Sequence, residues 1–205
     1  MRSQLLLFIL SLSVSLSASA QAPLQQWIDE AIKAGGGVVT VPPGEHVLPA
    51  GLVIKGAKKL ALRGMDKERC ILRLAKSPDG KTPRSLIQIE AGCETIEIAN
   101  LTLDGAGMAI STLVNIAPEK AKPDTKDITV RDCLFEESSG DGFSVGHAGA
   151  CVVERCSFRD FKGVAVHFGV EATEGVARGN HIIRCGKAFD VRDAAKCSLV
   201  GNEEH

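Results

Sequence analysis

The sequence has no tyrosine and a single tryptophan, which argues against a saccharide site built on stacked aromatic platforms. Its formal net charge is −1, and this near balance argues against a nucleic-acid partner, which would call for a basic surface. Its seven cysteines form no CxxC or Cys/His pattern with zinc-ligand spacing. After the N-terminus, no apolar run has membrane-spanning length. Nucleic-acid-binding, zinc-ribbon and multispanning membrane proteins are therefore disfavoured as classes.

The first 20 residues have the pattern of a secretory signal peptide. Arg2 supplies the positive start, Leu5 to Leu16 is a short apolar stretch, and Ala18-Ser19-Ala20 is a small-x-small cleavage site. We therefore expect a secreted or periplasmic protein, cut after Ala20, that makes no membrane contact once the signal is removed. A retained N-terminal anchor is the alternative.

The rest of the chain, residues 21–205, is predicted to be a single domain that begins with a capping helix over 21–37. The apolar residues of this segment fall on one helical face, and Gly35-Gly36-Gly37 ends the helix. Residues 38–205 are predicted to form coils of short strands, starting at Val38–Val41. An amphipathic helix in front of such a stack covers its open first edge.

A repeat of 23 residues is the main signal of the coil region. Asp132–Phe135 aligns with Arg155–Phe158, and Phe143–Gly146 aligns with Val166–Gly169. A period in the twenties with several strands per unit is typical of a solenoid. A leucine-rich repeat fits poorly, because the unit lacks a helix and uses Ile, Val, Phe and Cys in place of a leucine ladder. We therefore predict an all-β fold, a right-handed parallel β-helix with coils about 4.8 Å apart.

The repeat predicts columns of buried residues that run through the coils. The first column contains the pairs Ile87/Ile89, Val114/Ile116, Phe143/Val145, Val166/Phe168 and Phe189/Val191. The second contains Ile96/Ile98, Ile128/Val130, Cys151/Val153 and Gly175/Ala177. Cys133 and Cys156 stack in a third column with Asn180 next. Buried cysteines pack as small hydrophobic residues, so we expect a ladder of free thiols, with disulfides as the alternative in an exported protein.

One outward-facing line of polar residues lies between the inward pairs of the first column. It consists of Gln88, Asn115, Ser144, His167 and Asp190. The line has three interpretations: a solvated polar ladder, a substrate-binding face, or a nucleophile, base and orienting carboxylate formed by the last three. We favour the substrate-binding face, with polysaccharide as the partner.

Several segments resemble the pectate lyase-like right-handed β-helix superfamily. The segment LQQWIDEAIKAGGGVVTVPPGEHVL resembles its start, and ITVRDCLFEESSGDGFSVG and CVVERCSFRDFKGVAVHFG resemble its generic parallel β-helix repeats. The resemblance implies this fold over nearly all of the mature chain. The superfamily includes lyases, hydrolases, epimerases and proteins without known catalysis. Gly146-His147-Ala148-Gly149 only partly matches the polygalacturonase Gly-His-Gly motif, and neither an Asn-Thr-Asp nor an Arg-x-Lys motif is present.

Two catalytic hypotheses assign roles on the same face. A lyase needs a base, for which His167 or Arg192 is the candidate, and a cation to neutralise a uronate carboxylate, such as Lys187. No motif requires a cofactor, but Asp141 and Asp190 are candidate ligands for Ca²⁺ in that reaction. A glycoside hydrolase would instead use Asp141 and Asp190 as its two carboxylates. The rival to both is a non-catalytic scaffold or adhesion module.

Two long loops, over residues 76–84 and 117–126, are expected to border this face. Lys81 and Arg84 would give one wall a positive charge suited to an acidic sugar, although both loops can equally be solvated surface. The last coil is expected to be uncovered, so self-association through it is also predicted.

Overall fold

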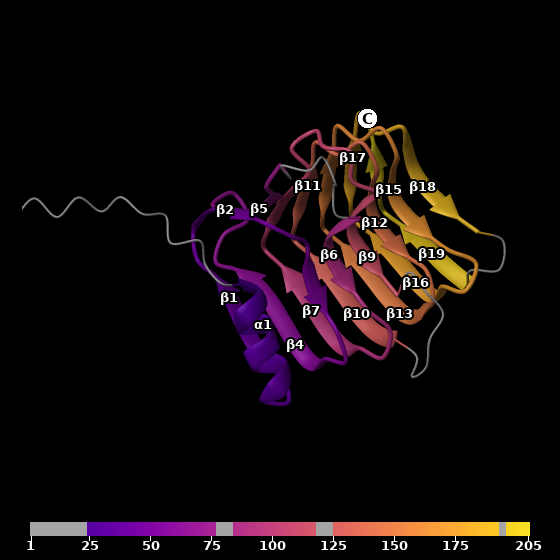
Figure 1. The fold of residues 1–205 in the computed structure, drawn as a ribbon. Helices are drawn as coiled ribbons and strands as arrows, with labels where there is room; N and C mark the ends of the chain where they lie inside the picture. The colour runs from indigo at the N-terminus through magenta and orange to yellow at the C-terminus, as the bar shows by residue number, and fades with distance from the viewer. Residues whose placement is uncertain (1–23, 77–83, 118–124, 193–195) are drawn as a thin grey trace, which may run out of the picture.

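The computed structural model describes residues 24–76, 84–117, 125–192 and 196–205. The predicted signal peptide lies outside these ranges. The described residues form a stack of coils, and each coil except the last contributes one strand to each of three parallel sheets (Figure 1). The predicted right-handed parallel β-helix is confirmed.

The strands recur in the order sheet A, sheet B, sheet C along the chain. Sheet A contains β1 (Gly37–Val41), β4 (Lys58–Gly64), β7 (Glu94–Ala99), β10 (Thr125–Arg131), β13 (Ala148–Glu154), β16 (Thr173–Arg178) and β19 (Lys196–Val200). Sheet B contains β2 (Gly44–Leu48), β5 (Cys70–Leu74), β8 (Thr102–Asp104), β11 (Leu134–Glu136), β14 (Ser157–Arg159), β17 (His181–Ile183) and β20 (Glu203–Glu204). Sheet C contains β3 (Leu52–Ile54), β6 (Ser85–Ile89), β9 (Thr112–Ile116), β12 (Asp141–Val145), β15 (Val164–Phe168) and β18 (Lys187–Val191).

The one helix among the described residues, α1 (Leu24–Lys33), lies at the first end of the stack and contacts β1, β3 and β4 (Figure 1). It buries Leu24 and Ile28 against the core, as a capping helix should. The helix ends at Lys33, and the chain turns through the glycines to enter β1. A side chain at Gly36, whose φ is +125°, would collide with the Lys58 carbonyl. No helix in the described ranges is long and apolar enough to cross a membrane.

The core consists of the predicted inward columns. In sheet C, Phe143 is in register with Val114 on one side and Val166 on the other. In sheet A, Ile128 lies between Ile96 and Cys151. Burying each such side chain contributes about 1.5–3 kcal/mol, so the stacked columns supply the main stabilisation of the fold.

The third column turns the corner from sheet A to sheet B. Cys133, Cys156 and Asn180 are all buried along it, and all seven cysteines are free, which confirms the thiol ladder. Burial raises the pKa of the Cys156 thiol, so this sulfur stays protonated. The Asn180 side chain accepts a hydrogen bond from the Cys156 amide at 2.9 Å and donates one to the Val153 carbonyl at 3.1 Å.

The corner that enters sheet A is built differently. One residue in each of five coils has a left-handed backbone there, with φ between +49° and +57°: Lys59, Thr95, Asp127, Ala150 and Glu174. None of the five is glycine, although glycine adopts this conformation most readily. The bend separates the first residues of β10, β13 and β16 from the rest of their strands and shapes the surface described below.

Candidate functional site on sheet C

The outward ladder of sheet C exists as predicted. Strand register places Asn115 beside Gln88 and Ser144, and His167 beside Ser144 and Asp190. All five side chains are half-buried. Residues up to 102 positions apart in sequence thus line one face (Gln88 to Asp190).

His167 lies between two carboxylates. Its Nδ1 is 3.9 Å from Asp141 Oδ2, and its Nε2 is 3.6 Å from Asp190 Oδ2. Both distances exceed hydrogen-bond length, and Nε2 is buried without a hydrogen-bond partner. The imidazole is therefore flanked by negative charge at both nitrogens but is not fixed by a hydrogen bond at either one.

Asp141 is positioned by the backbone of the next coil. Its Oδ1 accepts a hydrogen bond from the Val164 amide at 2.8 Å. This approach requires a glycine at position 163, because a Cβ there would lie 2.5 Å from Asp141 Oδ1 and 2.7 Å from the Gly140 carbonyl oxygen. The repeat that places Gly140 one coil before Gly163 thus also fixes the Asp141 carboxylate.

Asp190 is held by two cations. Lys187 Nζ donates to Asp190 Oδ1 at 2.7 Å, and Arg192 Nε lies 3.2 Å from Oδ2. The Lys187 hydrogen bond and the Arg192 charge hold the pKa of Asp190 below its usual value, against the opposing effect of partial burial. Asp190 is therefore an ionised carboxylate and is unsuited to donating a proton near neutral pH.

The contacts of Ser144, Arg192 and His167 show which of the predicted catalytic roles each side chain could take. Within the described residues, no hydrogen bond joins Ser144 to His167, so the serine is not activated as a nucleophile. Arg192 is ion-paired with Asp190, and an arginine is effectively always protonated, so it is unsuited to act as a base and His167 is the remaining candidate. Arg84 is exposed at the edge of sheet C, whereas Lys81 and most of both long loops lie outside the described residues.

A Ca²⁺ ion between Asp141 and Asp190 does not fit this arrangement. The His167 ring occupies the space between the two carboxylates, and Lys187 and Arg192 already neutralise Asp190. The described part of the chain also contains no cluster of three His, Cys, Asp or Glu side chains suited to a metal. The expected calcium site is therefore not supported.

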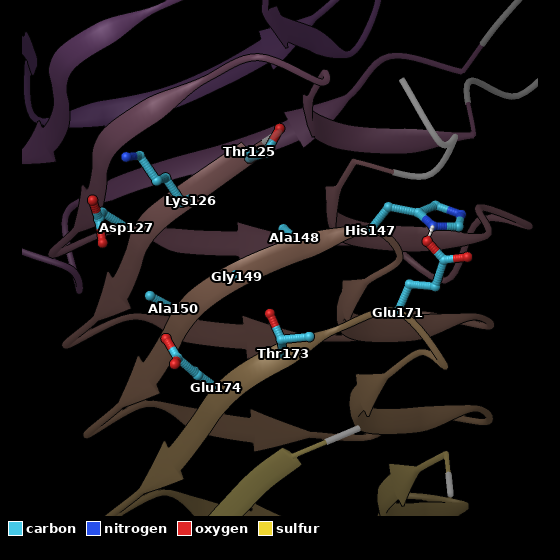
Figure 2. Close-up of a pocket in the computed structure, with 10 residues that line it drawn as sticks. All are labelled: Thr125, Lys126, Asp127, His147, Ala148, Gly149, Ala150, Glu171, Thr173 and Glu174. Atoms are coloured by element: carbon cyan, nitrogen blue, oxygen red, sulfur yellow. Dashed lines mark ion pairs between the residues drawn. The ribbon is translucent and has the colours of Figure 1, made fainter. Parts of the chain in front are cut away.

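A pocket lies at the N-terminal ends of the sheet A strands β10, β13 and β16 and is here called the sheet A pocket (Figure 2). No sequence pattern had indicated it. It has a volume of about 500 Å³ and is lined by Thr125, Lys126, Asp127, His147, Ala148, Gly149, Ala150, Glu171, Thr173 and Glu174. His147 Nδ1 lies 3.1 Å from Glu171 Oε2. The spacing of 24 residues between these two, close to the repeat, is the signal that could have indicated the pair.

The three parallel sheets and the end-capping helix define the chain as a right-handed parallel β-helix protein. No protein-family model and no curated protein sequence matches it. Its fold is similar to that of a proposed glycosyl hydrolase from Parabacteroides merdae, with a TM-score of 0.62, 11% identity and 88% of each chain covered. The fold is also similar to that of the A-modules of two mannuronan C-5 epimerases from Azotobacter vinelandii, AlgE6 and AlgE4.

For AlgE6 the TM-score is 0.55, with 20% identity and 88% of this chain covered. For AlgE4 it is 0.54, with 22% identity and 90% covered. The chain spans about half of each epimerase module, 52% and 54% respectively. These likenesses show that the chain shares the parallel β-helix fold of these proteins.

Proposed function

We propose that the protein acts on an acidic polysaccharide bound along sheet C, and that His167 accepts a proton from a uronate unit. The observation that carries this proposal is the placement of His167 between Asp141 and Asp190, with Lys187 and Arg192 alongside. The β-helix neighbours, a proposed glycosyl hydrolase and two mannuronan epimerases, support a polysaccharide as the class of substrate.

Each charged group has a role in this chemistry. The exposed parts of Lys187 and Arg192 bind the uronate carboxylate, and their positive charge makes the C5 proton easier to remove. The buried Nε2 of His167 faces Asp190, so the substrate meets the Nδ1 side of the ring. Asp190, kept ionised by its cations, stabilises the imidazolium that forms. A hydrolase is less well supported, because the His167 ring lies between Asp141 and Asp190, where a hydrolase needs room for the glycosidic bond between its two carboxyl groups.

The proposal includes export. The first 20 residues predict a signal peptide, and a secreted or periplasmic location would bring the protein to extracellular polysaccharides.

The test is deuterium uptake at C5 when the mature protein is incubated with alginate or pectate in D₂O. If the abstracted C5 proton is replaced from solvent, deuterium enters at C5. If the C4 glycosidic oxygen leaves instead, a C4=C5 double bond forms and C5 carries no hydrogen, so this second outcome is detected by the ultraviolet absorbance of the unsaturated uronate. We expect His167→Ala to lower the rate about 10²–10⁴-fold, the usual contribution of a general base. His181→Ala is the matched control, because His181 is an exposed histidine on sheet B, paired with Glu203.

Binding is measured in parallel by affinity electrophoresis. Lys187→Ala and Arg192→Ala should weaken retention by either polymer. Polymer binding with neither deuterium uptake at C5 nor unsaturated product would overturn the catalytic part of the proposal in favour of the non-catalytic binding module. Equal activity of His167→Ala and His181→Ala would show that His167 is not the base.

A further inference from the structure

The sheet A pocket has the shape of a small-ligand site. Its floor is Ala148-Gly149-Ala150, a stretch of β13 without long side chains, and side chains from the coils on either side rise around it (Figure 2). Its volume of about 500 Å³ lies within the usual range for small-molecule pockets. A sugar ring can therefore lie flat on this floor.

Polar groups stand on two sides of the floor. Lys126, Asp127 and Glu174 lie on one side, and the His147–Glu171 pair lies on the other (Figure 2). The Nδ1 of His147 is buried and, although 3.1 Å from Glu171, makes no well-directed hydrogen bond. A buried imidazole nitrogen without a directed partner is costly unless a ligand or water completes it.

The charge of the pocket selects against an acidic ligand. Three carboxylates line it, and its single ammonium, on Lys126, is drawn to Glu94 at 3.0 Å. Asp127 and Glu174 are exposed and form no ion pair or hydrogen bond with another described residue. Carboxylates at the border of the pocket can accept hydrogen bonds from sugar hydroxyls and pair with an ammonium group.

We propose that the sheet A pocket is a second carbohydrate site, which binds an amino sugar unit through its ammonium and hydroxyl groups. The exposed Thr173 hydroxyl borders the same floor and adds neutral hydrogen-bonding capacity, whereas the buried Thr125 hydroxyl is already bonded to the Gly92 amide and the Glu90 carbonyl. This site is independent of the proton-transfer proposal, because its lining residues are not those of the sheet C ladder.

The test is calorimetric titration of the mature chain with a glucosamine trisaccharide, compared with its N-acetylated form and with a uronate trisaccharide. The N-acetylated form keeps the ring and hydroxyls but lacks the charge. We expect the glucosamine oligomer to bind at least about ten-fold more tightly than either other ligand. The double variant Asp127→Asn/Glu174→Gln, and separately His147→Ala, should each weaken its binding by about ten-fold or more.

Glu137→Gln is the matched control, because Glu137 is also an exposed carboxylate at a left-handed corner, with φ +54°, but is not among the pocket residues. It should leave glucosamine binding unchanged. Absence of glucosamine binding, equal affinity for the N-acetylated trisaccharide, or an equal loss in Glu137→Gln would overturn the proposal. The pocket variants should leave deuterium uptake on alginate or pectate unchanged, so the two proposed sites fail or stand separately.

Discussion

At the scale of single residues, Thr95 combines a β-branched side chain with a left-handed backbone, φ +57°, at the corner that enters β7. Such a residue is a conformational outlier, and the left-handed region costs a non-glycine residue about 1–2 kcal/mol. We expect Thr95→Gly to raise the free energy of unfolding by about 1 kcal/mol, after allowing for the extra entropy of glycine in the unfolded chain. Denaturant titration measures it.

Thr129→Gly is the control for that substitution. Thr129 lies within β10 of the same sheet, in register with Glu97, and its φ is not positive. There the loss of a β-branched side chain should lower the free energy of unfolding by about 1 kcal/mol. If both substitutions destabilised the protein equally, the corner at Thr95 would not be strained.

Residue-scale features were also the hardest to predict from sequence. The left-handed corners carry Lys, Thr, Asp, Ala and Glu, none of which indicates that conformation as glycine would. The His147–Glu171 pair joins two turns between sheets C and A, where the strict alternation of the strands does not apply. The distances around His167 depend on side-chain rotamers, which strand register alone does not determine.

At the scale of strands, prediction from sequence worked because alternation and period are both set by backbone geometry. The 23-residue spacing of Ser144, His167 and Asp190 placed them in one register line, and the strands β12, β15 and β18 hold them there. A shift of one residue in strand register would move all these polar side chains to the inner face of the sheet. The buried residues that flank each of them, such as Phe143 and Val145 on either side of Ser144, therefore fix the register.

The stacking of the coils also brings charged side chains of successive coils together, because Asp132 follows β10 and Arg155 follows β13, one coil later. Asp132 accepts hydrogen bonds from Arg155 at 2.8 and 3.0 Å and from Arg131 at 2.7 Å. The hydrogen bonds from Arg155 have the largest effect on the pKa of Asp132 and lower it. Partial burial opposes them with a smaller effect, and the Arg131 hydrogen bond lowers the pKa further, so the net pKa lies below its usual value. A carboxyl with a lowered pKa in the folded state stabilises the fold above its unfolded-state pKa, ordinarily 3.8, and loses that effect as the pH falls through the folded-state value.

We therefore expect Asp132→Asn to lower the free energy of unfolding at pH 7 by about 0.5–1 kcal/mol, a modest figure because the pair is partly exposed. The difference from the unchanged protein should vanish as the pH is lowered below the ordinary value of 3.8. Thermal unfolding followed across pH measures both effects. Asp29→Asn, at an exposed position on α1, is the control and should change little. A difference that persisted at low pH would contradict the role of the Asp132 charge.

At the scale of the whole molecule, the two ends of the described stack differ. The first end is covered by α1, whereas β18, β19 and β20 each have a hydrogen-bonded neighbour on one side only among the described residues. Leu199 and Val200 on β19 are 44% and 56% exposed. An uncovered row of backbone groups beside apolar side chains is a template for pairing with another strand.

We expect two copies of this chain to associate reversibly through that end, and sedimentation velocity over a range of concentrations measures the association. Leu199→Lys/Val200→Lys should shift the protein towards monomer, because like charges would then meet across the paired edge. Val38→Lys is the matched control, since Val38 is 60% exposed on β1 at the opposite end of the same sheet. An unchanged protein that stays monomeric at the highest concentration, or a Val38→Lys variant that dissociates as readily as the double variant, would show that the last coil does not mediate association.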